Sequence, residues 1–464
     1  MKTVFRKNIS DGFWYTFGDI INRAAVFLLI PFYTAYFTKE EYGLLSLVVI
    51  FTTISNHLIS FGSKTALLRL VYDYPINEKK ALIFTTICNL SFVLFTILVF
   101  LLGFNFIAYK CNWNVLYYLK YCYFICFHSF FFSIINIGLT LMRVDRKAKS
   151  FITFISLKVI IEILLIFFFV KFLTDGILGK IVGSFSSVVI LSFVIYFFSI
   201  RQTICFRYSK KLSKVYLNFA TPLVINNLIG WTLVSYDQFL FKDKFGLKEL
   251  AVLTLVLQIC SIYKVSMEGA LRAFNVYLYE KMNKAKEGIE EVFLFFISLF
   301  SISGFLIIIF KKEIILLIST SEYMEGETFI VYFVFSRFIM LISILVAFFV
   351  LLEKNSKEIA KSTVISMLTM LIFSTYLIPN YGFFGASITA ILTYASGNIY
   401  LSFVLKKSMS FYSTKSFLAI LVFVFVLLIN ICFLVDLQLN LVMLLSYTLF
   451  LSVLNKETFK RIFA

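Results

Sequence analysis

The 464 residues of the chain are 61% hydrophobic and 15% charged, and the mean hydropathy is +0.93. Soluble globular proteins are about 45–50% apolar, so this composition excludes a soluble fold and indicates a polytopic membrane protein. The formal net charge of +18 would suit nucleic acid. However, most Lys and Arg lie in short loops between apolar runs, where the positive-inside rule places them, so we expect no nucleic-acid partner.

Apolar runs long enough to cross a bilayer recur along the whole chain. A helix needs about 20 apolar residues to cross the hydrocarbon core. This window predicts fourteen spans, with twelve or thirteen as alternatives because the last two are short and close together. The spans lie near residues 13–37, 42–62, 81–104, 115–141, 150–173, 176–200, 215–237, 250–271, 291–310, 328–352, 362–379, 382–405, 416–435 and 437–454.

The basic residues predict the orientation of these spans. With the N-terminus inside, the cytoplasmic segments hold 29 of the 43 Lys and Arg, whereas the outside loops and their edges hold eight. The positive-inside rule therefore predicts that both termini are cytoplasmic. The N-terminal apolar segment lacks a small-residue cleavage site, so we expect a retained first helix.

Two sequence matches at nearly one offset indicate an internal repeat. "FTKEEYGLLSLVV" at 37–49 aligns with "FGLKELAVLTLVL" at 245–257, an offset of 208, and "GILGKIVGS" at 176–184 aligns with "GFFGASITA" at 382–390, an offset of 206. The offset spans six predicted helices. An even number of helices per repeat predicts a parallel repeat, and transporters with such halves place the substrate between them.

Several stretches of the chain resemble the Wzx-type polysaccharide flippases. These belong to the multidrug/oligosaccharidyl-lipid/polysaccharide exporter superfamily, which also holds the multidrug and toxin extrusion (MATE) exporters and the lipid II flippases. The segment from Asn8 to Arg69 resembles the family's opening, with Pro31, Tyr42-Gly43 and Gly62 at the pattern positions. "LNFATPLVINNLIGWTLVSYDQFLF" resembles its seventh span, and "LIPNYGFFGASITAILTY" resembles its twelfth.

The resemblance implies an all-α polytopic membrane protein of 12–14 transmembrane helices with a MATE-like architecture. It implies two parallel six-helix bundles, at 1–208 and 209–410, and about two additional C-terminal helices at 411–464. It also implies a flippase that moves undecaprenyl-diphosphate-linked oligosaccharide repeat units from the cytoplasmic to the periplasmic leaflet by alternating access, for O-antigen or capsule assembly. We expect the lipid-linked substrate, membrane lipids, a polysaccharide polymerase and a chain-length regulator as partners.

Charged residues within the spans are the candidate site residues, because ionisable groups at membrane depth usually face a cavity. Three pairs are spaced at i, i+4 and can meet on one helix face: Asp19/Arg23, Lys158/Glu162 and Lys264/Glu268. A structural ion pair between helices is the alternative interpretation of each. At the repeat offset none of these charges recurs, which favours a role with substrate or a coupling ion.

The cations suit a diphosphate, since Arg presents a planar fork of donors to phosphate oxygens. Arg23, Lys180 and Arg337 have no surplus of acid around them in the sequence, apart from Asp19, and we predict that they contact the diphosphate. Lys158, Lys264, Asn226 and Asn227 are supporting candidates.

Energy coupling is predicted to use the acids of the spans. The chain has no Walker A glycine loop, so an H⁺ or Na⁺ gradient is the expected source, bound at Asp19, Glu162, Asp237 or Glu268. The cysteines form no CxxC pair and no metal-ligand set, so we expect no cofactor and no metal.

Two other functions are compatible with a chain of this composition. An ion-coupled multidrug exporter on the same scaffold would need an acidic or aromatic cavity, against which the unpaired cations argue. A membrane-bound polysaccharide polymerase or glycosyltransferase would need a large outside loop, and the longest outside connection, 311–327, is only about 17 residues. We therefore expect a transporter and not an enzyme.

Overall fold

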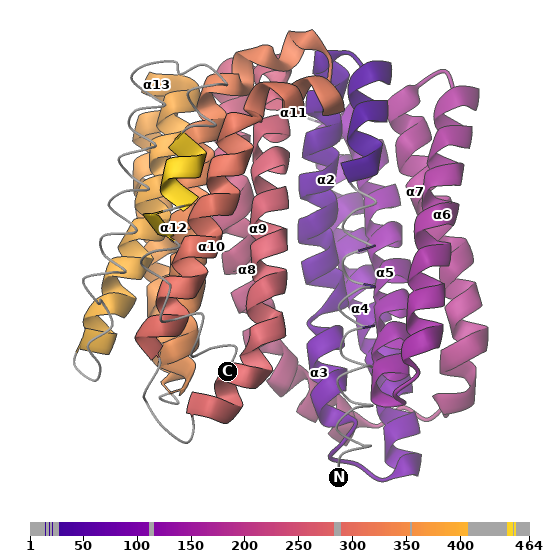
Figure 1. Cartoon of the computed structure of the whole chain (residues 1–464). Coiled ribbons are helices and arrows are strands. Elements are labelled where there is room, and N and C mark those ends of the chain that lie inside the picture. Colours follow the sequence, from indigo (N-terminus) through magenta and orange to yellow (C-terminus); the bar gives the residue numbers. More distant parts are fainter. Residues whose placement is uncertain are drawn as a thin grey trace. The chain divides into compact units, whose positions relative to one another are not determined.

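The computed structural model describes residues 14, 18, 21, 27–110, 116–282, 289–352, 355–406, 443–448, 450 and 451. Within these ranges only the backbone is described at 106–110, 116–120, 268–270, 272–282, 289–292, 352, 356 and 406. The described residues form helices joined by short connections (Figure 1). Contacts divide the chain into two compact units, the first comprising Met1–Tyr33 and Leu44–Trp231 and the second Thr34–Gly43 and Thr232–Ala464.

The first unit contains six α-helices and the start of a seventh. In chain order they are α2 (Lys39–Ser60, whose first turn belongs to the second unit), α3 (Ser63–Leu70), α4 (Ile76–Lys110), α5 (Leu116–Val144), α6 (Ala148–Phe172), α7 (Gly176–Ile195) and the first part of α8 (Lys210–Phe245). A π-helical turn, η1 (Tyr196–Ile200), and a 3-10 turn, η2 (Arg201–Thr203), follow α7.

Local sequence explains where several of these helices begin and end. Phe61 and Gly62 have positive φ angles of 43° and 65°, which ends α2 and separates it from α3. The Asp175 carboxylate accepts a hydrogen bond from the Leu178 N–H at 3.0 Å and so caps the start of α7.

Glycines allow α6 and α7 to pack with their backbones in contact. A Cβ added at Gly179 would lie 2.7 Å from the carbonyl oxygen of Phe169, and one at Gly183 would lie 2.8 Å from the Cα of Ile166. Gly179 and Gly183 therefore have a packing role. This contact fixes the position of α6 beside α7.

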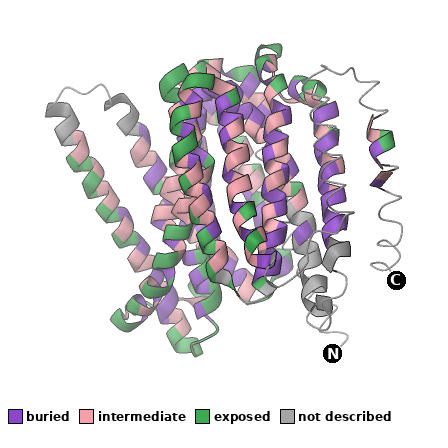
Figure 2. Ribbon diagram, turned by 90° about the vertical axis from the view of Figure 1, so that its left-hand side faces the viewer, coloured by how far each residue is buried: buried purple, intermediate pink, exposed green. Residues whose placement is uncertain are grey.

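The second unit contains the end of α8 and five further α-helices. These are α9 (Leu247–Met282), α10 (Ile289–Ile309), α11 (Lys311–Ile318), α12 (Glu327–Leu352) and α13 (Ser356–Lys406), with the 3-10 turn η3 (Ser321–Gly326) before α12. α10 and α11 are bent by 66° at their junction. Buried and exposed residues share the same helices (Figure 2), as expected where one face packs on neighbours and another faces lipid.

The helix assigned to α13 is two antiparallel segments. Gly382 has φ 56° and ψ −128°, a conformation that essentially only glycine adopts. A Cβ at Gly385 would lie 2.1 Å from the carbonyl oxygen of Leu377, so the chain turns back on itself at this point. The two segments match the predicted spans 362–379 and 382–405.

The prediction of an all-α polytopic membrane protein is confirmed. The described residues contain nine helices long and apolar enough to cross a membrane, or ten if the bent pair α10 and α11 forms one span. The predicted span 416–435, most of 437–454 and much of the first half of 13–37 lie outside the described residues. The division of the contacts falls within α8, at Trp231, and the domain limits 1–208, 209–410 and 411–464 remain predictions.

The segments 37–49 and 245–257, which match at the repeat offset of 208, contact each other. Glu40 Oε1 lies 3.3 Å from Lys248 Nζ, and these two residues correspond at the offset of 208. A Cβ at Gly43 would lie 2.0 Å from the carbonyl oxygen of Leu247, so the start of α2 crosses the start of α9 with no room for a side chain. Tyr42 Oη donates a hydrogen bond of 2.7 Å to Gln258 beside this crossing.

Candidate functional site

A cavity of about 430 Å³ opens within the first unit and is our first candidate site. Five helices and the turn at Gly62 form its wall. The lining residues are Thr53, Asn56, His57 and Ser60 of α2, Gly62 of the turn, Ser63, Lys64 and Thr65 of α3, Phe132, Ile135, Asn136, Leu139, Thr140 and Arg143 of α5, Phe151, Ile155 and Lys158 of α6, and Asn227 of α8. We call it the unit 1 cavity.

The charge of the unit 1 cavity is positive. Lys64, Arg143 and Lys158 line it, and none of its described lining residues is Asp or Glu. The Arg143 guanidinium lies 4.6 Å from the centre of the Phe151 ring, and Lys158 Nζ lies 5.3 Å from the centre of the Phe132 ring. These cation–π contacts offset part of the desolvation of each charge without cancelling it.

Amides and hydroxyls complete the lining. Asn56, Asn136 and Asn227 contribute carboxamides, and the Oδ1 atom of Asn56 is buried without a hydrogen-bond partner in the described structure. A buried acceptor of this kind is costly unless a ligand or water satisfies it. The cavity can therefore bind a ligand that combines anionic groups with hydroxyl donors.

Lys158 is the best-defined cation of the cavity. It is 8% exposed, and its Nζ atom lies 3.8 Å from Glu162 Oε2, so the predicted i, i+4 pair is present. Lys180 on α7 lies close enough to Glu162 for electrostatic attraction. His128 on α5 is within the electrostatic reach of both lysines, and its Nε2 atom lies 3.4 Å from Ser184 Oγ.

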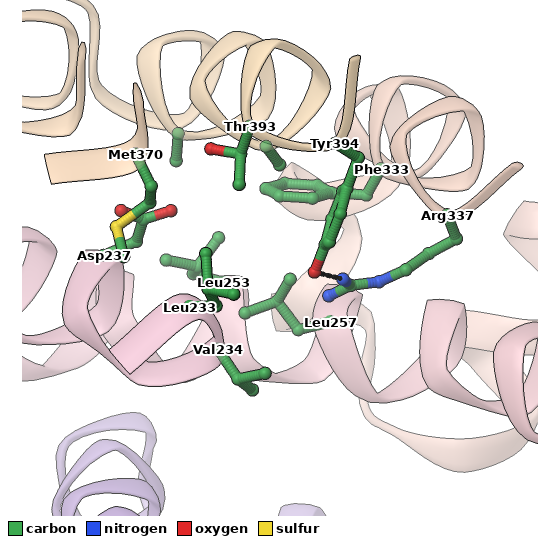
Figure 3. Close-up of a pocket in the computed structure, with 12 residues that line it drawn as sticks. Leu233, Val234, Asp237, Leu253, Leu257, Phe333, Arg337, Met370, Thr393 and Tyr394 are labelled. Carbon is green, nitrogen blue, oxygen red and sulfur yellow. Dashed lines mark hydrogen bonds between the residues drawn. The ribbon is translucent and has the colours of Figure 1, made fainter. Parts of the chain in front are cut away.

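The second unit holds a much smaller pocket around Asp237 and Arg337. Its volume is about 20 Å³, enough for about one water. Arg337 donates a hydrogen bond of 2.8 Å to Tyr394 Oη, whereas Asp237 lies at the other end of the pocket beside Met370 (Figure 3). Asp237 Oδ1 and Arg337 Nε are both buried without hydrogen-bond partners in the described structure.

The fold brings acids near two of the predicted cations. The sequence shows no surplus of acid around Lys180 and Arg337, whereas in the structure Glu162 acts electrostatically on Lys180 and Arg337 acts on Asp237. The partners come from other helices, α6 for Lys180 and α8 for Arg337, so spacing along the chain could not identify them. In this conformation the pocket beside Arg337 is also too small for a diphosphate.

The remaining sequence candidates are spread over the molecule. Asn227 lines the unit 1 cavity, whereas Asn226 and Lys264 line neither cavity. Asp19 and Arg23 lie outside the described residues, as does the side chain of Glu268.

Sequence reasoning missed Arg143 and Lys64 as site residues. Both were assigned to cytoplasmic segments, but α5 continues to Val144, beyond the predicted end of its span at 141. Asn136, Leu139, Thr140 and Arg143 follow the i, i+3, i+4, i+7 pattern of one helix face, and all four line the cavity. This pattern is the signal that could have identified Arg143.

Comparisons with known proteins agree with this architecture. A family model described as polysaccharide biosynthesis protein matches residues 9–273. Protein 1 of the Lsg locus of Haemophilus influenzae is 22% identical over 371 residues, covering 78% of this chain and 88% of that protein.

Solved structures of transporters have the same fold. The lipid II flippase MurJ in an inward closed conformation superposes with a TM-score of 0.70 at 13% identity, over 98% of this chain and 100% of that chain. A multidrug resistance MATE family transporter of the MOP superfamily, inward-facing, gives a TM-score of 0.61 at 14% identity, over 87% of this chain and 96% of that one. At these identities the likeness shows the fold alone.

Proposed function

Since the chain belongs to the polysaccharide biosynthesis protein family, we propose that it is a flippase for lipid-linked oligosaccharides. The observation that carries this proposal is the unit 1 cavity, whose described lining has three cations and no carboxylate. The fold shared with a lipid II flippase supports the same reaction class.

The chemistry of the cavity matches the parts of such a substrate. A lipid-linked oligosaccharide carries a diphosphate between its lipid and its sugars, and this charge must cross a region of low dielectric constant. Arg143 and Lys158 would replace part of the hydration of the phosphates, because hydrogen bonds to charged groups are about twice as strong as neutral ones. Asn56, Asn136 and Asn227 would meet sugar hydroxyls.

The proposed substrate is an undecaprenyl-diphosphate-linked repeat unit for O-antigen or capsule assembly. The protein would collect it in the cytoplasmic leaflet of the bacterial inner membrane and release it to the periplasmic leaflet by alternating access. Both termini would be cytoplasmic, as the distribution of basic residues favours. A polymerase and a chain-length regulator would act on the flipped product.

The proposed coupling site is Asp237. Its Oδ1 atom is buried without a hydrogen-bond partner and faces a space of about one water. A proton or a sodium ion would satisfy this oxygen, and the charge of Arg337 in the same pocket would make the ion easier to release.

A multidrug exporter is the rival function on the same fold. Cationic drugs need acidic or aromatic groups, whereas the described lining of the unit 1 cavity repels cations. The two functions therefore predict opposite charge preferences for the ligand.

The test combines binding with complementation. Equilibrium binding of geranylgeranyl diphosphate to the full chain in nanodiscs would be measured for wild type, Arg143→Ala, Lys158→Ala and the control Lys149→Ala. Lys149 is exposed and lies on the same helix as Lys158, outside the cavity. Surface polymer would be followed on a gel in a flippase-null strain, together with Arg23→Ala and Arg337→Ala.

We expect each cavity variant to bind the probe about tenfold more weakly or worse and to make little polymer at equal protein level, because each loses a charge-assisted contact. Lys149→Ala should match wild type. Tighter binding of a cationic dye than of the diphosphate would favour the exporter instead.

A further inference from the structure

We propose that a basic and aromatic surface at one end of the first unit binds the phosphate headgroups of anionic phospholipids in the surrounding bilayer. We call this surface the linker patch. Its basic residues are Lys79 and Lys80 at the start of α4 and Arg207, Lys210, Lys211 and Lys214 around the start of α8. Lipid binding at this surface is separate from transport through the unit 1 cavity and does not depend on the substrate carried there.

Hydrogen bonds order the connection 204–209, which joins η2 to α8, beside the start of α4. The Ser209 N–H donates to Thr85 Oγ1 at 3.1 Å, and Ser213 Oγ donates to Asn89 Oδ1 at 3.0 Å. The two acceptors are one turn apart on α4, so the starts of α4 and α8 lie side by side. Basic residues that are more than 120 positions apart in the sequence therefore form one surface.

The linker patch has few acids to balance its cations. Residues 76–80 and 204–214 together contain six Lys and Arg and one acid, Glu78. The first turn of α8 has no acid, and Lys210 and Lys214 are spaced there at i, i+4, where like charges repel each other. An anionic partner relieves this repulsion, so the charge of the surface is complementary to a phosphate group.

Exposed aromatic rings lie beside these cations. Phe206 and Tyr208, on either side of Arg207, are 75% and 53% exposed. The centre of the Phe206 ring lies 5.3 Å from the centre of the Phe84 ring of α4 in an edge-on contact, which fixes its position. Exposed aromatic rings interleaved with basic side chains are typical of surfaces at the boundary between lipid headgroups and acyl chains.

The ends of three apolar spans place the linker patch at the level of the headgroups. The segments Ile76–Asn105, Gly176–Thr203 and Lys210–Phe245 are each long and apolar enough to cross a membrane, and the connection 204–209 joins two of them. The positive-inside rule accounts for the sign of the charge in this connection. The hydrogen bonds to α4 and the exposed rings make it an ordered surface, which a lipid with a negative headgroup fits.

The test measures lipid binding to the purified, delipidated full chain by native mass spectrometry. Dissociation constants for phosphatidylglycerol and for phosphatidylcholine with the same acyl chains would be compared for wild type, Lys210→Gln/Lys211→Gln and Lys210→Arg/Lys211→Arg. The matched control is Lys242→Gln/Lys244→Gln, which removes two exposed lysines from the other end of α8. Crosslinking with a photoactivatable phosphatidylglycerol, followed by peptide mapping, locates the bound lipid.

We expect wild type to bind phosphatidylglycerol about tenfold more tightly than phosphatidylcholine. Lys210→Gln/Lys211→Gln should lower this preference at least fivefold, because each basic residue near an anionic surface contributes about fivefold in affinity. The arginine variant keeps both charges and should match wild type, as should the control. The crosslinks should map to peptides within residues 76–89 and 204–214.

The same lipid preference in wild type and Lys210→Gln/Lys211→Gln would overturn the proposal, and so would an equal loss in the control. If wild type showed no lipid preference but bound inorganic phosphate or a peptide of glutamates through these lysines, the surface would serve a free anion or an acidic protein segment instead. Neither result bears on diphosphate binding in the unit 1 cavity, which Lys210 and Lys211 do not line.

Discussion

Buried and half-buried cations in this protein contact aromatic rings as well as carboxylates. Arg143 lies over Phe151, Lys158 over Phe132, and the Arg337 guanidinium lies 5.7 Å from the centre of the Tyr394 ring. A ring stabilises a cation without cancelling its charge. The cations of the unit 1 cavity are therefore stabilised in the membrane and remain attractive to an anion.

The variant Arg143→Lys should distinguish the contribution of the positive charge to diphosphate affinity from that of the planar guanidinium group. Lysine keeps the positive charge but loses the planar fork that binds two phosphate oxygens, so we expect diphosphate affinity between those of wild type and Arg143→Ala. Equilibrium binding of geranylgeranyl diphosphate measures it. Equal affinities for Lys and Ala would show that geometry, not charge, decides binding at this position.

Asp237→Asn should uncouple transport from its energy source. The amide can bind neither a proton nor a sodium ion as the carboxylate does, so stimulation by an imposed gradient should be lost while diphosphate affinity stays within about twofold of wild type. Flipping of a fluorescent lipid diphosphate in proteoliposomes, with and without H⁺ or Na⁺ gradients, measures this. Asp243→Asn, exposed near the end of the same helix, is the control, and gradient stimulation surviving in Asp237→Asn would exclude this acid as the coupling site.

Helices in both units approach one another where glycine removes the side chain. Gly183 allows α6 and α7 to touch, Gly385 closes the hairpin of α13, and Gly43 lets α2 cross α9. In lipid the helices gain little from apolar burial, so close van der Waals packing at small residues drives their association. These glycines determine the placement of the helices that carry the charged residues.

Gly183→Ala should destabilise the folded protein. Its Cβ would lie 2.8 Å from backbone atoms of α6, and overpacking of this kind costs about 1–3 kcal/mol. A lower unfolding temperature in detergent, followed by size-exclusion chromatography after heating, would reveal the loss. Gly103→Ala is the matched control, because nothing lies within 4 Å of its Cβ position and a helical alanine is favoured by about 1 kcal/mol. Equal unfolding temperatures for the two variants would contradict the packing role.

The chain as a whole is organised by its apolar runs and by the charge of its connections. Long apolar helices alternate with short loops, and the basic residues favour one side of the resulting map. Orientation in the membrane is a property of the entire sequence, because it follows from the sum of many loop charges.

The native Cys205 offers a test of this orientation. It is exposed after η2, in a connection that the charge distribution assigns to the cytoplasm. In a variant whose other cysteines are serine, a membrane-impermeant maleimide should label Cys205 only after the membrane is opened. A cysteine placed at Glu322, which is exposed on the opposite side of the map, should be labelled in intact cells. Labelling of Cys205 but not of the cysteine at position 322 in intact cells would show that the predicted orientation is wrong.

The membrane class, the limits of most spans and the i, i+4 pair of Lys158 and Glu162 could all be predicted from the amino-acid sequence. These features depend on local composition and helical spacing, which are readable without tertiary contacts. The predicted spans 362–379 and 382–405 also correspond to the two segments of α13, because Gly382 and the apolar runs on either side of it indicate a turn between two spans.

Which charged residues share a site could not be predicted without the packing of the helices. Arg143 of α5, Lys158 of α6 and Lys64 of α3 line one cavity although they lie far apart in the chain, and Asp237 and Arg337 share a different pocket. Spacing predicts the face of a single helix, but the neighbour of that face depends on how whole helices pack. Lys180 therefore shows no nearby acid in the sequence, whereas in the fold Glu162 of the neighbouring helix α6 acts on it electrostatically.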